Sequence, residues 1–159
     1  MPKGLFIGLG GMGIATLSKL KAKLFHDAYD QNMDKMNQEC KFIFYDTDPK
    51  SKNDAFRDPE ICRLMGTENS IIEESSEYIT AASVAPQNLF NNAKIASSSD
   101  VKSQRMLEWM LDPENYGFTL PSRELNQGAS ASRMAGRVGV MDRAGEFETK
   151  IRNKLIELK

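Results

Sequence analysis

The chain has 159 residues, of which 40% are hydrophobic and 27% charged, and its 21 lysines and arginines nearly balance its 22 aspartates and glutamates. This length predicts one domain that buries its own core, and the balanced charge indicates neither a nucleic-acid partner nor a membrane partner. Apolar runs are too short for a membrane-spanning helix and the N-terminus lacks a secretory signal, so we expect a cytoplasmic protein.

The chain opens with the pattern of a strand, a glycine turn and a helix. Residues 4–8 (GLFIG) predict a short buried strand. Directly after the glycines, apolar residues recur at helical spacing, at Ile14, Leu17, Leu20 and Leu24. A second strand is predicted at residues 41–46 (KFIFYD), which are apolar on both faces, as in a parallel sheet covered by helices. A polar turn closed by Pro49 follows it.

The middle of the chain has weaker patterns. Helix signals occur in PEICRLM (59–65) and in TENSIIEESSEYITAA (67–82). The segment VAPQNLFNNAKIASSSD (84–100) predicts a loop, because its serines and asparagines oppose regular structure. The next helical pattern has an apolar face that we expect in the core, made by Met106, Trp109 and Met110.

The last segment predicts one long helix that begins at Arg133. Its apolar residues recur every three or four positions, at Met134, Val138, Met141, Ala144, Phe147, Ile151, Leu155 and Leu158. Gly136, Gly139 and Gly145 each weaken such a helix by about 1 kcal/mol relative to alanine. Glycines kept at that cost indicate a helix start that presses against another part of the chain.

Cysteine and histidine chemistry is sparse. Cys40 and Cys62 are far apart and lack metal-ligand spacing, so we expect buried free thiols rather than a disulfide or a zinc site. His26 is the only histidine and falls late in a predicted helix, where a surface position near the helix C-terminus is expected. We therefore assign no catalytic residue and no metal ligand.

The glycine turn is the first candidate site. Gly8, Gly10 and Gly13 fit G-x-G-x-x-G between a strand and a helix, a context in which backbone N–H groups bind phosphate. The candidate phosphate-binding residues are Gly8, Gly10, Gly11, Met12 and Gly13. A dinucleotide site needs an acidic residue about 20 residues further on. The nearest acid that ends a strand is Asp46, 33 residues beyond Gly13, which weakens that interpretation. A structural glycine turn is the alternative.

Two further segments could contribute to a ligand site. Asp46, Thr47 and Asp48 follow the second strand, at the sheet edge where ligands bind, and could act through ribose hydroxyls, water or Mg²⁺. The alternative for them is an Asx turn ahead of Pro49. A run of small residues precedes the last helix and could bind a second phosphate, with Arg137 as a charge partner. This run is Gly128, Ala129, Ser130, Ala131 and Ser132, and a plain loop with a helix cap is its alternative.

Taken in this order, the three segments resemble the first three nucleotide loops of the tubulin and FtsZ superfamily. The family's GxGGxG turn, NTD-like turn and GAxAxxxxGR loop are represented here by GLGGMG (8–13), DTD (46–48) and GASASRMAGR (128–137). The third is the most specific of these matches. Bacterial proteins with a tubulin-like N-terminal domain are the most similar group.

The resemblance implies an α/β fold, with a Rossmann-like three-layer parallel sheet and flanking helices. It implies an incomplete tubulin/FtsZ-type nucleotide domain over residues 1–159, in which residues 50–120 are a partly helical insertion. The implied ligand is GTP or GDP, with or without Mg²⁺. Residues 8–13 would hold the α- and β-phosphates, residues 46–48 would face the phosphates and Mg²⁺, and residues 128–132 would sense the γ-phosphate. Arg137 would lie near the phosphates or the ribose.

Some family features have no counterpart in this chain. Ala15 stands where FtsZ has an asparagine, and Met134 stands where it has a glutamate, so two ligand contacts are missing. The glycine-rich GGGTGTG loop, the base-recognising helix and the catalytic loop of a neighbouring subunit do not occur before Lys159. We therefore expect an N-terminal fragment or a shortened relative that retains weak phosphate affinity without hydrolysis.

The sequence thus predicts the N-terminal nucleotide-binding part, for GTP, of a bacterial tubulin/FtsZ-like protein that self-associates head to tail in its full-length form. Two alternatives stay open. The first is a fragment of an NAD(P)-dependent oxidoreductase, supported by the glycine turn. The second is a non-enzymatic Rossmann-like scaffold or interaction module that has lost its nucleotide.

Overall fold

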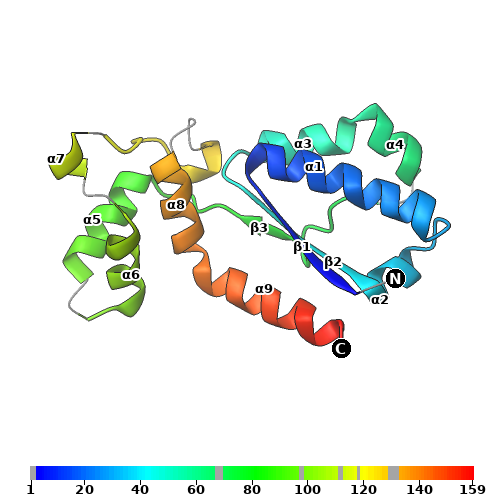
Figure 1. The fold of residues 1–159 in the computed structure, drawn as a ribbon. Helices are drawn as coiled ribbons and strands as arrows, with labels where there is room; N and C mark the ends of the chain where they lie inside the picture. Colours follow the sequence, from blue (N-terminus) through cyan, green and yellow to red (C-terminus); the bar gives the residue numbers. More distant parts are fainter. Residues whose placement is uncertain (1–2, 67–69, 97–98, 111–112, 118, 129–132) are drawn as a thin grey trace.

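The centre of the molecule is a three-stranded parallel sheet of order β1-β2-β3 (Figure 1). The computed structural model describes residues 3–66, 70–96, 99–110, 113–117, 119–128 and 133–159. The strands are β1 (Gly4–Leu9), β2 (Cys40–Asp46) and β3 (Tyr78–Thr80). In the register of the sheet, Gly4 pairs with Cys40 and Phe44 pairs with Tyr78. The predicted α/β, Rossmann-like fold is confirmed, and both predicted strands occur within one residue of the expected bounds.

Helices connect the strands on one face of the sheet. The first connection consists of α1 (Gly10–Lys23), the π-helical η1 (Leu24–Ala28) and α2 (Met33–Glu39). The second consists of α3 (Pro49–Arg57) and α4 (Pro59–Met65), and α1, α3 and α4 lie together above the sheet in Figure 1. The turn predicted at Pro49 is the start of α3, because proline suits the first helical position and the Asp48 carboxylate accepts a hydrogen bond from the Lys50 N–H at 2.8 Å.

The sheet has a hydrophobic core on each face, as the apolar pattern of β2 predicts. Phe42 and Phe44 point into the core beneath α1, α3 and α4, whereas Ile43 and Tyr45 point into the opposite core. All four side chains are 0–3% exposed. Successive residues of a strand face opposite sides, so one short strand supports both cores.

The second core is covered by the later helices. These are α5 (Pro86–Ala96), α6 (Val101–Trp109), the short α7 (Pro113–Tyr116), the 3₁₀ turn η2 (Leu125–Gln127), α8 (Arg133–Asp142) and α9 (Ala144–Glu157). In Figure 1, α5, α6 and α7 form a group beside α8, while α9 runs along the sheet on the face away from α1. Within the described residues, no helix has the length and apolar character needed to cross a membrane.

The helix predicted at residues 67–82 is wrong over its described part. Residues 70–77 form turns and bends, and the next three residues form β3. Ile71 and Ile72 are both buried in the first core although they are adjacent, which a helix with one buried face does not favour. Pairing of β3 with β2 therefore overrides the local helix propensity of this acidic segment.

The loop predicted at residues 84–100 is also wrong, because most of it forms α5. Pro86 begins this helix, and Phe90 and Ala93 are buried three residues apart on one face. Asn91 and Asn92 are exposed on the other side. The asparagines that indicated a loop thus occupy the solvated face of an amphipathic helix.

The predicted long C-terminal helix is divided in two. Arg143 has φ −95° and ψ 10°, outside helical geometry, and separates α8 from α9. This break lets Val138 of α8 and Phe147 of α9 enter the same core. The expected close contact at the helix start is confirmed at Gly139, where a Cβ would overlap the Tyr45 hydroxyl, but a Cβ at Gly136 would meet no atom within 4 Å.

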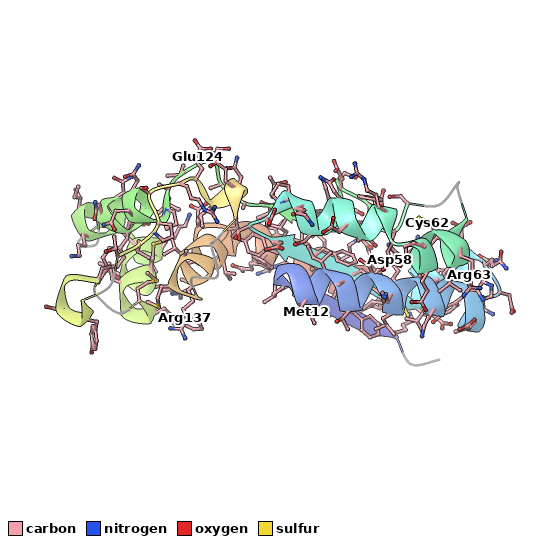
Figure 2. All side chains as sticks on the ribbon, turned by 90° about the horizontal axis from the view of Figure 1, so that it is seen from above. Met12, Asp58, Cys62, Arg63, Glu124 and Arg137 are labelled. Atoms are coloured by element: carbon pink, nitrogen blue, oxygen red, sulfur yellow. The ribbon has the colours of Figure 1, made fainter. Side chains whose placement is uncertain are left out.

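Two side chains expected in the core are exposed. Cys40 is buried as expected, but Cys62 lies on the outer side of α4, because Ile61 and Leu64 occupy the side that faces the core (Figure 2). Trp109 is 66% exposed, although Met106 and Met110 next to it on the same segment are buried.

Candidate functional site

The glycine turn joins the carboxyl end of β1 to the first turn of α1. A Cβ on Gly8 would lie 2.7 Å from the carbonyl oxygen of Gly13, so both residues must be glycine for the strand and the helix to pack this closely. Gly10 has φ +71°, in the left-handed region that favours glycine. Leu9 at the N-cap supplies no side-chain hydrogen bond, and the first turn has no acidic residue. Met12 is 82% exposed on the same turn.

The residues of the second predicted segment, 46–48, have two different roles. Asp46 is only 9% exposed, and its Oδ1 accepts a hydrogen bond from the Thr47 N–H at 2.7 Å. A Cβ on Gly11 would lie 3.6 Å from Asp46 Oδ2, so this carboxylate lies beside the glycine turn. Asp48 instead caps α3. The structure thus brings Asp46 and Thr47 to the glycine turn and gives Asp48 a structural hydrogen bond, as the Asx alternative predicts.

The third predicted segment meets the second through the backbone. The Gly128 N–H donates to the Thr47 carbonyl oxygen at 2.9 Å, and Gly128 has φ +93°. Arg123 Nε donates a hydrogen bond to the Gly128 carbonyl oxygen at 3.1 Å and so stabilises the turn. Ala129, Ser130, Ala131 and Ser132 lie outside the described residues, so the structure leaves their predicted role untested.

Part of each segment borders one cavity of about 590 Å³, a size typical of small-ligand sites. Its lining residues are Leu9, Gly10, Tyr45, Asp46, Thr47, Trp109, Gly136, Arg137, Val140 and Met141. Gly10 is the predicted phosphate-binding residue of the first segment that lines it, whereas Gly11 and Met12 line a separate pocket between α1 and α3. Arg137 comes from the second turn of α8 and Met12 from the first turn of α1, and Figure 2 shows both on the same side of the molecule. Arg137 contacts the Met134 sulfur at 3.9 Å and forms no ion pair within the described part of the chain. Its guanidinium is therefore available to an anion.

Tyr45 is a member of this site that the sequence did not indicate. It is 3% exposed, and its hydroxyl has no hydrogen-bond partner among the described residues. Its ring meets Phe147 edge-on, with centroids 5.3 Å apart. Burial, reinforced by the Asp142 carboxylate, raises the pKa of Tyr45 well above its usual range, so the hydroxyl stays neutral and can donate a hydrogen bond.

Trp109 is the second member that the sequence placed elsewhere. In the sequence it is part of an apolar helical pattern, which predicts a position in the core. The sequence held one indication of its exposed position, since Met106 and Met110 on the same segment could occupy the core without it.

The site has little capacity to bind a metal ion through protein side chains alone. Within the described ranges, no three His, Cys, Asp or Glu side chains are grouped so that they could hold a metal. Among the described residues, Asp46 is the one acidic residue that lines the cavity. This fits Mg²⁺ only in its common arrangement, with one or two carboxylates and the remaining ligands from phosphate and water.

Comparison with known proteins gives one result. A family described as tubulin-like matches residues 5–159, a range that includes all three segments and the whole cavity. No curated protein and no solved structure matches the chain.

Proposed function

Because this chain belongs to the tubulin-like family, we propose that it binds a guanine nucleotide, GTP or GDP, in the cavity between its three loops. The observation that carries the proposal is the convergence of the glycine turn, Asp46 and Arg137 on one cavity at the carboxyl edge of a parallel sheet, the edge where ligands bind in such folds. We propose further that the chain is part of a bacterial, cytoplasmic, FtsZ-like protein whose full-length form self-associates head to tail.

The residues present fit a phosphate group. A Cβ on Gly10 would meet no atom within 4 Å, so the backbone at the start of α1 is open to the cavity. Its amides and the helix dipole favour an anion there, and Arg137, which forms no ion pair with the described residues, adds a positive charge. Asp46 would act through Mg²⁺ or the ribose hydroxyls, and Ser130 and Ser132 would add hydroxyl donors. These groups supply binding and orientation only, so we assign no catalytic step to this chain.

One observation supports a second candidate, a dinucleotide. Asp46 ends β2 beside the glycine turn, which is the place of the acidic residue that binds ribose in dinucleotide folds. The long spacing between Gly13 and Asp46 is explained by η1 and α2, which extend the connection. The family match favours the guanine nucleotide over this candidate.

Calorimetric titration of the full-length protein with GTP, GDP, ATP and NADPH, each with and without Mg²⁺, tests the proposal. We expect binding of GTP and GDP, stronger with Mg²⁺ for GTP. Binding of NADPH without binding of either guanine nucleotide would contradict the proposal and favour the oxidoreductase. No binding of any of them would favour a scaffold that has lost its nucleotide.

Arg137→Ala should weaken GTP binding roughly 10- to 150-fold, because a hydrogen bond to a charged group contributes about 1.5–3 kcal/mol. Its exposed position predicts little change in thermal stability. Arg63→Ala is the matched control, since Arg63 is exposed on α4, away from the cavity (Figure 2). Equal affinities for the two variants would remove Arg137 from the site.

A further inference from the structure

Trp109 is the only tryptophan of the chain, and it lines the cavity while remaining 66% exposed. It ends α6, a helix whose core-facing residues are Ser103 and Met106. The indole therefore contributes little to the core. An exposed large aromatic ring at a cavity wall is typical of a ligand contact, because stacking would remove its apolar surface from water.

Helix α6, which ends at Trp109, is held against α8, which carries Arg137. Helix α6 packs against α8, and Lys102 Nζ donates to the Asp142 carbonyl oxygen at 2.6 Å and to its Oδ1 at 3.1 Å. These bonds join the start of α6 to the end of α8, the helix that carries Arg137. The two helices that carry the indole and the guanidinium thus pack together.

The cavity is lined by residues of two chemical kinds. Gly10, Asp46, Thr47 and Arg137 supply backbone donors and charge, whereas the remaining wall is mostly apolar. The apolar wall consists of Leu9, Trp109, Val140 and Met141. A nucleotide has the same division, with charged phosphates at one end and a flat, largely apolar ring at the other. Tyr45 lines the same cavity, and its buried hydroxyl packs against Gly139 and has no hydrogen-bond partner among the described residues.

We propose that Trp109 stacks on the base of the bound nucleotide and so contributes one aromatic face to the surface that binds the base. This inference rests on the proposed function and assigns the base to a helix within the predicted insertion at residues 50–120. It gives that segment a role in ligand binding. Stacking does not depend on the identity of the base, so Trp109 would contribute affinity for any purine ring and would not by itself distinguish guanine from adenine.

The sole tryptophan makes this proposal directly measurable by its fluorescence. GTP should quench or shift the Trp109 emission, whereas inorganic tripolyphosphate, which has no base, should bind in calorimetry and leave the emission unchanged. Trp109→Ala should weaken GTP binding roughly 5- to 150-fold and leave tripolyphosphate binding unchanged. Trp109→Phe, which keeps an aromatic face, should recover part of the loss.

Tyr116→Ala is the matched control, because Tyr116 is a 65% exposed aromatic residue that does not line the cavity. It should leave GTP affinity unchanged. If GTP binds in calorimetry but Trp109 emission stays constant and Trp109→Ala binds GTP as tightly as the natural protein, the stacking proposal is wrong and the proposed function stands. If neither GTP nor tripolyphosphate binds, both proposals are wrong.

Discussion

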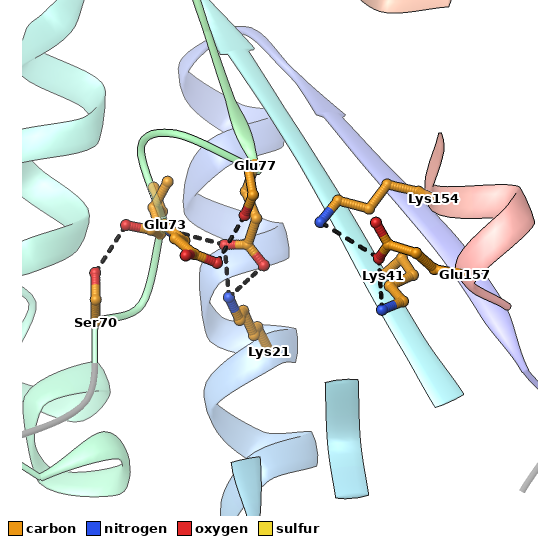
Figure 3. A network of polar contacts seen from close by, with 9 residues as sticks. Lys21, Lys41, Ser70, Glu73, Glu77, Lys154 and Glu157 are labelled. Carbon is orange, nitrogen blue, oxygen red and sulfur yellow. Dashed lines mark hydrogen bonds and ion pairs between the residues drawn. The ribbon is translucent and has the colours of Figure 1, made fainter. Parts of the chain in front are cut away.

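Replacing Glu77 with alanine should lower the free energy of unfolding by about 3–5 kcal/mol, because it leaves the ammonium of Lys21 buried without its partner. Lys21 and Glu77 are 2% and 5% exposed. Lys21 Nζ lies 2.6 Å from both carboxylate oxygens of Glu77, as Figure 3 shows. Glu77 Oε2 also accepts the Glu73 N–H at 2.8 Å, so the pair joins α1 to the segment that precedes β3.

The loss of stability should depend on pH. Burial lowers the pKa of Lys21, and the Glu77 carboxylate opposes that shift, so the Glu77→Ala variant lowers this pKa further. The unfolded chain then holds a proton that the folded chain has released. Stability therefore rises with pH in the window from the lowered folded pKa up to the usual lysine value of 10.5. The deficit of the variant should be smaller at pH 9 than at pH 7.

Urea unfolding of the natural protein and three variants measures this effect. The double variant Lys21→Met, Glu77→Leu should recover most of the lost stability, because replacing both members of a buried ion pair with apolar residues is often neutral. Glu148→Ala is the control, since Glu148 pairs with Arg152 in an exposed ion pair and should matter little. A Glu77→Ala variant within 1 kcal/mol of the natural protein would contradict the prediction.

Elements that depend on local pattern were predicted well. The apolar runs of β1 and β2 and the helical spacing after the glycines are properties of short segments, and the structure reproduces them. β3 has only three residues and pairs with residues 44–46, more than thirty positions earlier in the chain. Its acidic surroundings favour a helix in isolation, so the sequence could not reveal a strand that depends on a distant partner.

The candidate site shows the same limit. The approach of Asp46 to the glycine turn followed from the rule that carboxyl ends of parallel strands share an edge. The capping role of Asp48 was one of two open alternatives, and local sequence could not decide between them. Trp109 was assigned to the core because the orientation of α6 depends on how it packs against α5 and α8, which is a property of the whole fold.

Gly11→Asp should weaken GTP binding by at least about 100-fold, or about 2.7 kcal/mol. The new Cβ would lie 3.6 Å from Asp46 Oδ2 and 3.0 Å from Ser51 Oγ, a side chain that can rotate away. A second carboxylate would thus stand beside Asp46, at the turn proposed to hold phosphate. It would repel the phosphates of the ligand, and two like charges about 4 Å apart repel by roughly 4 kcal/mol at an effective dielectric constant of 20, enough for the expected loss of affinity.

Gly11→Asn is the matched control, because asparagine has nearly the same shape as aspartate but no charge. It should lose less affinity than Gly11→Asp, and the difference between the two variants measures the electrostatic part of the effect. Circular dichroism should confirm that both variants fold, since Gly11 has a helical position on α1 where either side chain has room once Ser51 rotates. Affinities of both variants within threefold of the natural protein would mean that the phosphates do not bind at this turn, because a carboxylate beside them would repel them.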